Sequence, residues 1–140
     1  MNGDRPPPSR IDKTRAIEAL PVSGNRHGVL VVASGIEAGR VIVPNRDTLT
    51  TLGRDPACTF SFDDESLSRE HAVVMRAAGA YILKDTSTNG TFVNDKRLTN
   101  VIELREGDRV QLGAGTFFRF QFVDAGEEAA LRKVYEAAHL

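Results

Sequence analysis

The chain has little of what would cross-link it or draw it to a charged polymer. Its 140 residues include one cysteine, Cys58, so no disulfide can form within the chain, and no metal-ligand spacing surrounds it. Lysine plus arginine total 18 and aspartate plus glutamate 19, a formal net charge of -1. That balance provides no general attraction for nucleic acid or membranes. We expect a reducing, cytoplasmic setting, no metal or other cofactor, and local capture of any anionic ligand.

Long apolar runs are also missing. No stretch approaches the roughly 20 residues that cross a bilayer, and the N-terminus lacks the apolar core of a secretory signal. Residues 1–27 contain three consecutive prolines and too few apolar side chains to offset the entropy cost of folding. We therefore expect 1–27 to be a flexible tail. The 41% hydrophobic content of the chain is enough for one domain with a single core.

Residues 28–124 alternate short apolar runs with turn residues, which predicts many short strands. In the last of these runs, alternation places Phe118, Phe120 and Phe122 on one face, which we expect to be core. Ala78-Gly79 and Glu106-Gly107-Asp108 separate apolar runs and are predicted to be hairpin turns. Frequent short strands and turns predict an all-β sandwich.

Residues 125–140 have helical periodicity instead. Asp124 with Glu127 three positions on resembles a capping box. The apolar stripe consists of Leu131, Val134, Tyr135 and Ala138. This stripe can pack on the sandwich or pair with a second copy of the chain as a homodimer. No stop signal precedes Leu140, so we expect the helix to be a linker to a missing downstream domain.

Three polar clusters lie between the predicted strands. Their guanidinium, hydroxyl and amide groups suit a doubly charged tetrahedral anion, whose oxygens accept short charge-assisted hydrogen bonds. The clusters are Gly53-Arg54, Ser68-Arg69-Glu70-His71 and Ser87-Thr88-Asn89-Gly90-Thr91. They indicate a site for a phosphate group.

In order and spacing, these clusters resemble the signature of the forkhead-associated (FHA) domain, over roughly residues 28–124. The resemblance implies a sandwich of two sheets with about eleven short strands, whose loops at one end bind phosphothreonine in an extended peptide. It implies a noncatalytic signalling module that recognises partners phosphorylated by Ser/Thr kinases. Neither nucleic acid nor a membrane is an expected partner.

The resemblance also implies roles for single residues. Arg54 matches the arginine that binds phosphate, Ser68 the hydroxyl that binds it, and Thr88 a second hydroxyl or backbone contact. Asn89 matches the asparagine that holds the peptide main chain. Arg69 either adds charge to the pocket or points to solvent.

Structural support is implied for Gly53, for Gly90, and for His71, whose ring holds the binding hydroxyl in place. Ser66 stands where the family often varies the side chain that reads the third residue after the phosphothreonine. Being small and uncharged here, it argues against a strong acidic preference at that place.

Other readings of these residues exist. Arg54 could be a solvated surface arginine, Thr88 could close a local turn, and Asn89-Gly90 could serve only as a positive-φ turn. Ser68 and His71 also invite a hydrolase triad with Asp85, which we reject because no nucleophile elbow or oxyanion-hole sequence is present.

Residues 131–140 are similar to the helix that precedes a GGDEF diguanylate cyclase domain in bacterial FHA fusions, which would make the chain a sensory module. The main alternative function is a scaffold that dimerises without phosphate and regulates an attached output domain.

Overall fold

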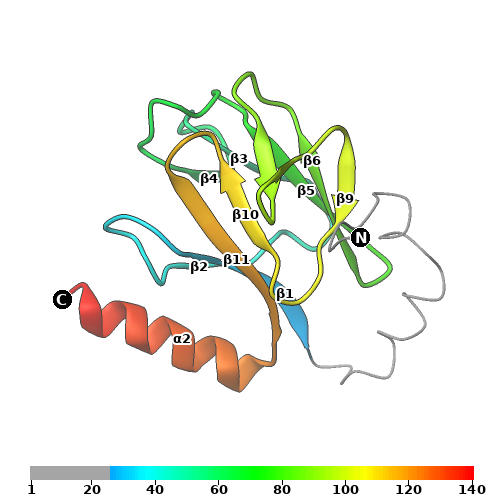
Figure 1. Ribbon diagram of the computed structural model, residues 1–140. Helices are drawn as coiled ribbons and strands as arrows, with labels where there is room; N and C mark the ends of the chain where they lie inside the picture. Colours follow the sequence, from blue (N-terminus) through cyan, green and yellow to red (C-terminus); the bar gives the residue numbers. More distant parts are fainter. Residues whose placement is uncertain (1–25) are drawn as a thin grey trace.

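The computed structural model describes residues 26–140 (Figure 1). The predicted tail 1–27 lies outside the described residues, except for Arg26 and His27. Within these residues, eleven strands are followed by one helix. Their bounds are β1 His27–Val32, β2 Val41–Ile42, β3 Thr50–Gly53, β4 Phe60–Ser61, β5 Ala72–Ala77, β6 Ala80–Asp85, β7 Thr91–Val93, β8 Lys96–Arg97, β9 Val101–Glu103, β10 Arg109–Leu112, β11 Thr116–Val123 and α2 Ala125–Ala138.

The strands form two sheets, of six strands in the order β2-β1-β11-β10-β7-β8 and of five in the order β4-β3-β5-β6-β9. Neighbouring strands run antiparallel, except that β3 pairs with β4 in parallel through Leu52 and Phe60. The arrangement confirms the predicted two-sheet sandwich with a C-terminal helix.

Aromatic rings from both sheets fill the space between them. Phe118 and Phe120 of β11 are fully buried, and the Phe118 ring meets Phe62 edge-on at a centroid distance of 5.3 Å. Tyr81 of β6 lies 5.4 Å from Phe120 and accepts a 2.8 Å hydrogen bond from the Gly28 N–H at its hydroxyl, so its polar atom is satisfied. The predicted aromatic face of β11 is therefore core, with Phe122 packed at its margin.

One predicted hairpin turn is confirmed and the other is wrong. Ala78 and Gly79 join β5 to β6 with φ of 53° and 85°. Residues 106–108 instead connect β9 of one sheet to β10 of the other. Asp108 is buried and accepts hydrogen bonds from the Arg105 N–H at 2.8 Å and the Asn94 side chain at 2.9 Å. The turn signal reports a chain reversal but cannot reveal which sheet receives the next strand.

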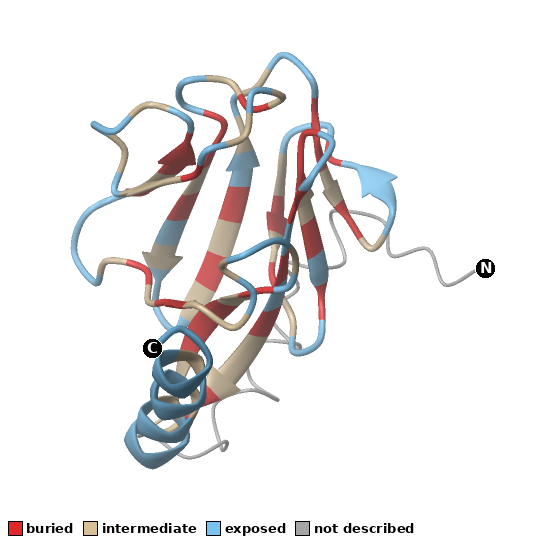
Figure 2. Cartoon of the chain, turned by 90° about the vertical axis from the view of Figure 1, so that its left-hand side faces the viewer, coloured by how far each residue is buried: buried red, intermediate tan, exposed pale blue. Residues whose placement is uncertain are grey.

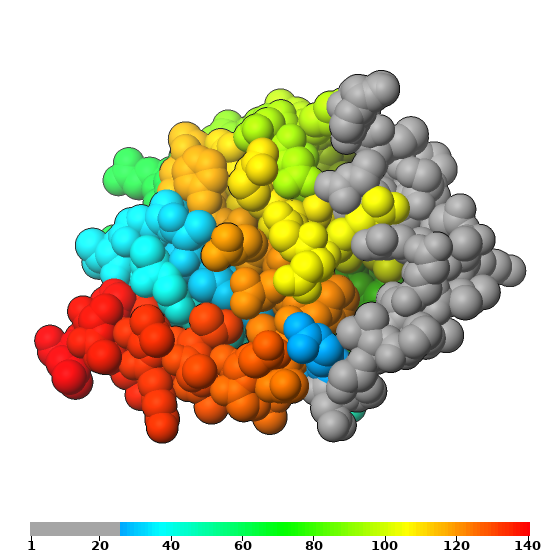
Figure 3. Space-filling view, turned by 60° about the horizontal axis from the view of Figure 1, so that its bottom comes forward, coloured from blue at the N-terminus to red at the C-terminus, as the bar shows by residue number. Residues whose placement is uncertain are grey.

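The terminal helix α2 begins with the predicted capping box, in which Asp124 and Glu127 each accept a 2.8 Å hydrogen bond from the other's backbone N–H. The helix lies along the outside of the six-stranded sheet (Figure 3), and Leu131 packs against the cluster around Val29. None of its residues is buried (Figure 2), and Val134 is 69% exposed. Within residues 26–140, none of the helical segments combines the length and the apolar composition that a transmembrane span requires.

Candidate functional site

The predicted site residues meet in a groove at the end of the sandwich that is uppermost in Figure 1. The loops after β3, β4 and β6 form this groove, whose volume is about 500 Å³. It is lined by Arg54, Leu67, Ser68, Arg69, Glu70, Thr86, Thr88 and Asn89. All five residues predicted to contact the phosphopeptide are among them.

Arg54 is anchored to the loop after β4 at two points. Its backbone N–H donates to the Ser68 carbonyl at 3.0 Å, and its Nε–H donates to the Leu67 carbonyl at 3.0 Å. The two terminal nitrogens have no partner among residues 26–140, so both can donate to an anion. The guanidinium is thus oriented before any ligand arrives.

Gly53 permits the close approach of these two loops. A Cβ atom at this position would lie 2.1 Å from the carbonyl oxygen of Arg69, a distance at which backbone must move. Its φ is not in the positive region, so the requirement for glycine here is space. A glycine just before the arginine therefore allows Arg54 to reach the groove.

His71 is fully buried beneath the groove and links two loops through its ring. Its Nδ1 accepts a 3.0 Å hydrogen bond from the Ser68 backbone N–H, so the ring proton lies on Nε2 and is donated to the Gly90 carbonyl at 2.8 Å. Neither ring nitrogen is hydrogen-bonded to the Ser68 hydroxyl within residues 26–140. Asp85 accepts hydrogen bonds from Ser87 and Thr91 instead. These three residues do not form the relay of a hydrolase triad.

The Ser68 hydroxyl is held by the opposite loop. Its oxygen accepts a 3.0 Å hydrogen bond from the Thr88 backbone N–H, which leaves the hydroxyl proton for a ligand acceptor. The Thr88 hydroxyl has no partner within the described chain. Two hydroxyl donors therefore face the groove from two loops.

The Asn89 carboxamide uses only part of its hydrogen-bonding capacity within residues 26–140. One amide N–H donates to the Ser66 carbonyl at 2.8 Å, which fixes the plane of the carboxamide. The second N–H and the carbonyl oxygen stay available, a pair that matches the acceptor and donor of a peptide bond. Below it, the Gly90 N–H donates to Ser87 Oγ at 2.8 Å, and Gly90 has a φ of 102°.

The Ser66 hydroxyl has no proton free for a ligand side chain in this arrangement. Its hydroxyl donates to Asp64 Oδ1 at 2.7 Å and accepts from the Ala114 N–H at 2.9 Å. Burial raises the pKa of Asp64, but hydrogen bonds from Thr116 and Ser66 outweigh it, and the net pKa is lowered. Sequence reasoning missed this support, because neither Asp64 nor Ala114 stands near Ser68 in a recognisable motif.

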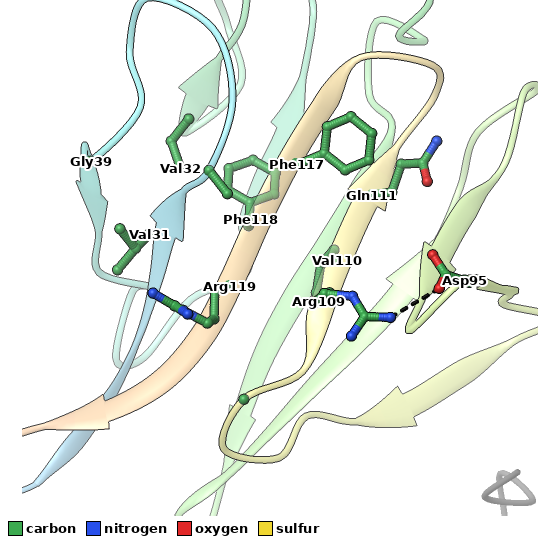
Figure 4. A pocket seen from close by; sticks show the side chains of 12 residues that line it. Val31, Val32, Gly39, Asp95, Arg109, Val110, Gln111, Phe117, Phe118 and Arg119 are labelled. Atoms are coloured by element: carbon green, nitrogen blue, oxygen red, sulfur yellow. Dashed lines mark hydrogen bonds and ion pairs between the residues drawn. The ribbon is translucent and has the colours of Figure 1, made fainter. Parts of the chain in front are cut away.

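A larger hollow, of about 810 Å³, lies on the outer face of the six-stranded sheet (Figure 4). Phe117 is 36% exposed there, and Arg109 forms a 2.9 Å ion pair with Asp95. It contains none of the predicted site residues. The smaller groove is the candidate site because hydrogen-bond donors of several residues converge there, although the hollow on the sheet is larger.

The two-sheet fold and its polar groove belong to a known family of domains. Residues 50–113 match the family model described as FHA domain. The chain belongs to the FHA domain family, which confirms the resemblance found in the sequence.

Two curated relatives are the "Oxoglutarate dehydrogenase inhibitor" of Corynebacterium diphtheriae and that of Corynebacterium jeikeium. The first is 39% identical over 69% of this chain and 65% of its own length, and the second is 35% identical over 81% and 74%. This chain thus spans about two thirds of the first relative's length and about three quarters of the second's.

A solved structure from a structural and functional analysis of phosphothreonine-dependent FHA domain interactions superposes with a TM-score of 0.60. The superposed residues are 27% identical in sequence, and they cover 67% of this chain and 94% of the chain in the solved structure.

Proposed function

We propose that residues 28–124 bind phosphothreonine peptides and so recognise partners that Ser/Thr kinases have modified. The observation that carries this function is the convergence of a guanidinium, two hydroxyls and a carboxamide in one groove. Family membership and the phosphothreonine-dependent interactions of a similar FHA domain support it.

Each group has a role in this proposal. The two terminal nitrogens of Arg54 donate to two phosphate oxygens, and the hydroxyls of Ser68 and Thr88 donate further hydrogen bonds to the same phosphate. Asn89 bonds the peptide main chain, and Arg69 adds positive charge at the rim. Because the phosphate takes up a second proton near pH 6, binding weakens as the pH falls through that value.

The remaining assignments follow from the same proposal. The domain acts by binding and catalyses no reaction, and it works in the cytoplasm, where protein kinases supply its ligands. Residues 125–140 serve as a linker to a downstream output domain, for which a diguanylate cyclase is one candidate.

Calorimetric titration with a matched pair of peptides tests the function. The two peptides differ only in phosphorylation of one threonine. We expect measurable affinity for the phosphothreonine form and none for the other. Equal affinity for the two would refute phosphate recognition.

A second candidate is a phosphate-independent scaffold that dimerises through α2. The observation in its favour is that α2 has no buried residue and leaves Val134 69% exposed. Sedimentation of the full chain and of a variant lacking residues 125–140 distinguishes the two. Self-association that is lost with the deletion and unchanged by phosphopeptide supports the scaffold.

A further inference from the structure

The groove is not uniformly cationic. Arg54 and Arg69 line it, but so does Glu70, which is exposed. The carboxylate of Glu70 has no hydrogen bond or ion pair within residues 26–140. A bare carboxylate beside a phosphate site repels a dianion, so its presence influences which peptides can bind.

The position of Glu70 is fixed by its backbone. Its carbonyl accepts a 3.1 Å hydrogen bond from the Thr86 hydroxyl, and the next residue, His71, is fully buried. The side chain therefore starts from a rigid point on the groove wall and ends in solvent. A cation on the ligand can therefore pair with this exposed carboxylate from the solvent side.

A second acidic surface lies next to the groove along the chain, since Glu65 is two residues before Leu67, which lines the groove. A hollow of about 690 Å³ is lined by Asp63 and Glu65 from the loop after β4, and both side chains are exposed and unpaired in the described chain. Ser66 follows this pair directly and is bonded through its carbonyl to Asn89. A peptide that leaves the groove over Asn89 and Ser66 therefore meets carboxylates.

We propose that this domain selects phosphothreonine peptides with lysine or arginine close to the phosphothreonine, and that Glu70 is the specificity-determining residue on the groove wall. The inference rests on the proposed function. The phosphate pairs with Arg54 and Arg69, and the basic residue of the peptide pairs with the carboxylate of Glu70. Acidic flanking residues are rejected by like-charge repulsion, and Ser66 has no proton to donate to them because its hydroxyl donates to Asp64.

The test uses three phosphothreonine peptide sets, with neutral, lysine or glutamate residues placed in turn at each of the flanking positions. The wild type is expected to bind the best lysine peptide about two- to fivefold more tightly than the neutral one, and the glutamate peptide more weakly. The preference should shrink at high salt because the groups are exposed.

Variants assign the effect to one carboxylate. Glu70→Gln should reduce the lysine preference, and Glu70→Lys should shift it toward the glutamate peptide. Glu136→Gln is the matched control, since it removes one exposed carboxylate on α2, far along the chain from the groove. A combined Asp63→Asn and Glu65→Gln variant measures how much of the lysine preference depends on these two carboxylates.

Equal affinity of the wild type for the three sets overturns the inference, and so does an identical response of the Glu70→Gln and Glu136→Gln variants. In both cases the phosphothreonine peptides still bind. Failure of every phosphothreonine peptide to bind contradicts the proposed function itself, so the two failures are distinguishable.

Discussion

The hydroxyl oxygen of Ser68 accepts a hydrogen bond of 3.0 Å from the backbone N–H of Thr88. This contact joins the loop after β4 to the loop after β6. The contact occupies one lone pair of the Ser68 oxygen, and the hydroxyl proton stays available to a ligand in the groove. One hydroxyl therefore both assembles the site and can bind ligand.

Replacing Ser68 by alanine should weaken phosphopeptide binding by about 10-fold or more, because a hydrogen bond to a charged group contributes roughly 1.5–3 kcal/mol. Thr88→Val is the informative comparison. It removes one hydroxyl but keeps the N–H that bonds Ser68, so its loss should be smaller. Calorimetry measures both, and unchanged affinity for Ser68→Ala would remove this hydroxyl from the site.

Arg54→Ala should abolish detectable binding while the domain stays folded, because the exposed side chain makes one hydrogen bond within residues 26–140, to the Leu67 carbonyl. Arg54→Lys keeps the charge but loses the paired N–H donors and should bind poorly. Circular dichroism confirms folding in both cases. Retained affinity in a folded Arg54→Ala variant would contradict the phosphate contact.

Gly53→Ala should destabilise the domain, by about 2 kcal/mol or more, because its Cβ would overlap the Arg69 carbonyl in two packed loops. Gly126→Ala is the control. Its Cβ would meet only Asp124 at 3.4 Å, and alanine favours the first turn of α2. Thermal unfolding should show a lowered midpoint for the first variant only. Equal midpoints would mean that the loops do not approach this closely.

The docking of α2 should depend on pH through His139. Its ring nitrogens face the carbonyls of Ile36 and Tyr135, and these hydrogen bonds raise the pKa of the imidazole above its ordinary value. The nearby Glu37 carboxylate acts in the same direction. Only the protonated ring can donate to both carbonyls.

Since the folded pKa is the higher one, the contribution of this contact is complete below about pH 6.5 and is lost as the pH rises through the folded value. An NMR titration of the His139 ring should give a midpoint above 6.5. The Gly39 amide, which lies near Tyr135, should shift over the same range. A pH response of Gly39 that persists in His139→Ala would exclude this histidine as the cause.

Much of the fold could be predicted because its signals are local. Alternation in β11 identified Phe118 and Phe120 as core, and the pairing of Asp124 with Glu127 identified the start of α2. The short strand β8 was not expected, because Lys96 and Arg97 are exposed and have no apolar alternation. Its register is set instead by the turn at Asn94 and Asp95, whose φ values are 52° and 72°.

The residues of the candidate site could be listed from the sequence, but their hydrogen-bond partners could not. The tautomer of His71 depends on the Ser68 N–H and the Gly90 carbonyl, which meet only when the loops fold together. The engagement of Ser66 with Ala114 likewise joins residues 48 apart in the chain. Long-range contacts of this kind leave no periodic pattern.

The most direct test of the account is a backbone NMR titration of the full chain with a phosphothreonine peptide and its unphosphorylated twin. We predict that the phosphorylated form shifts the amide signals of Arg54, Ser68, Thr88 and Asn89, and that its twin leaves them in place. Shifts centred on the hollow around Phe117, or the same shifts with both peptides, would contradict it.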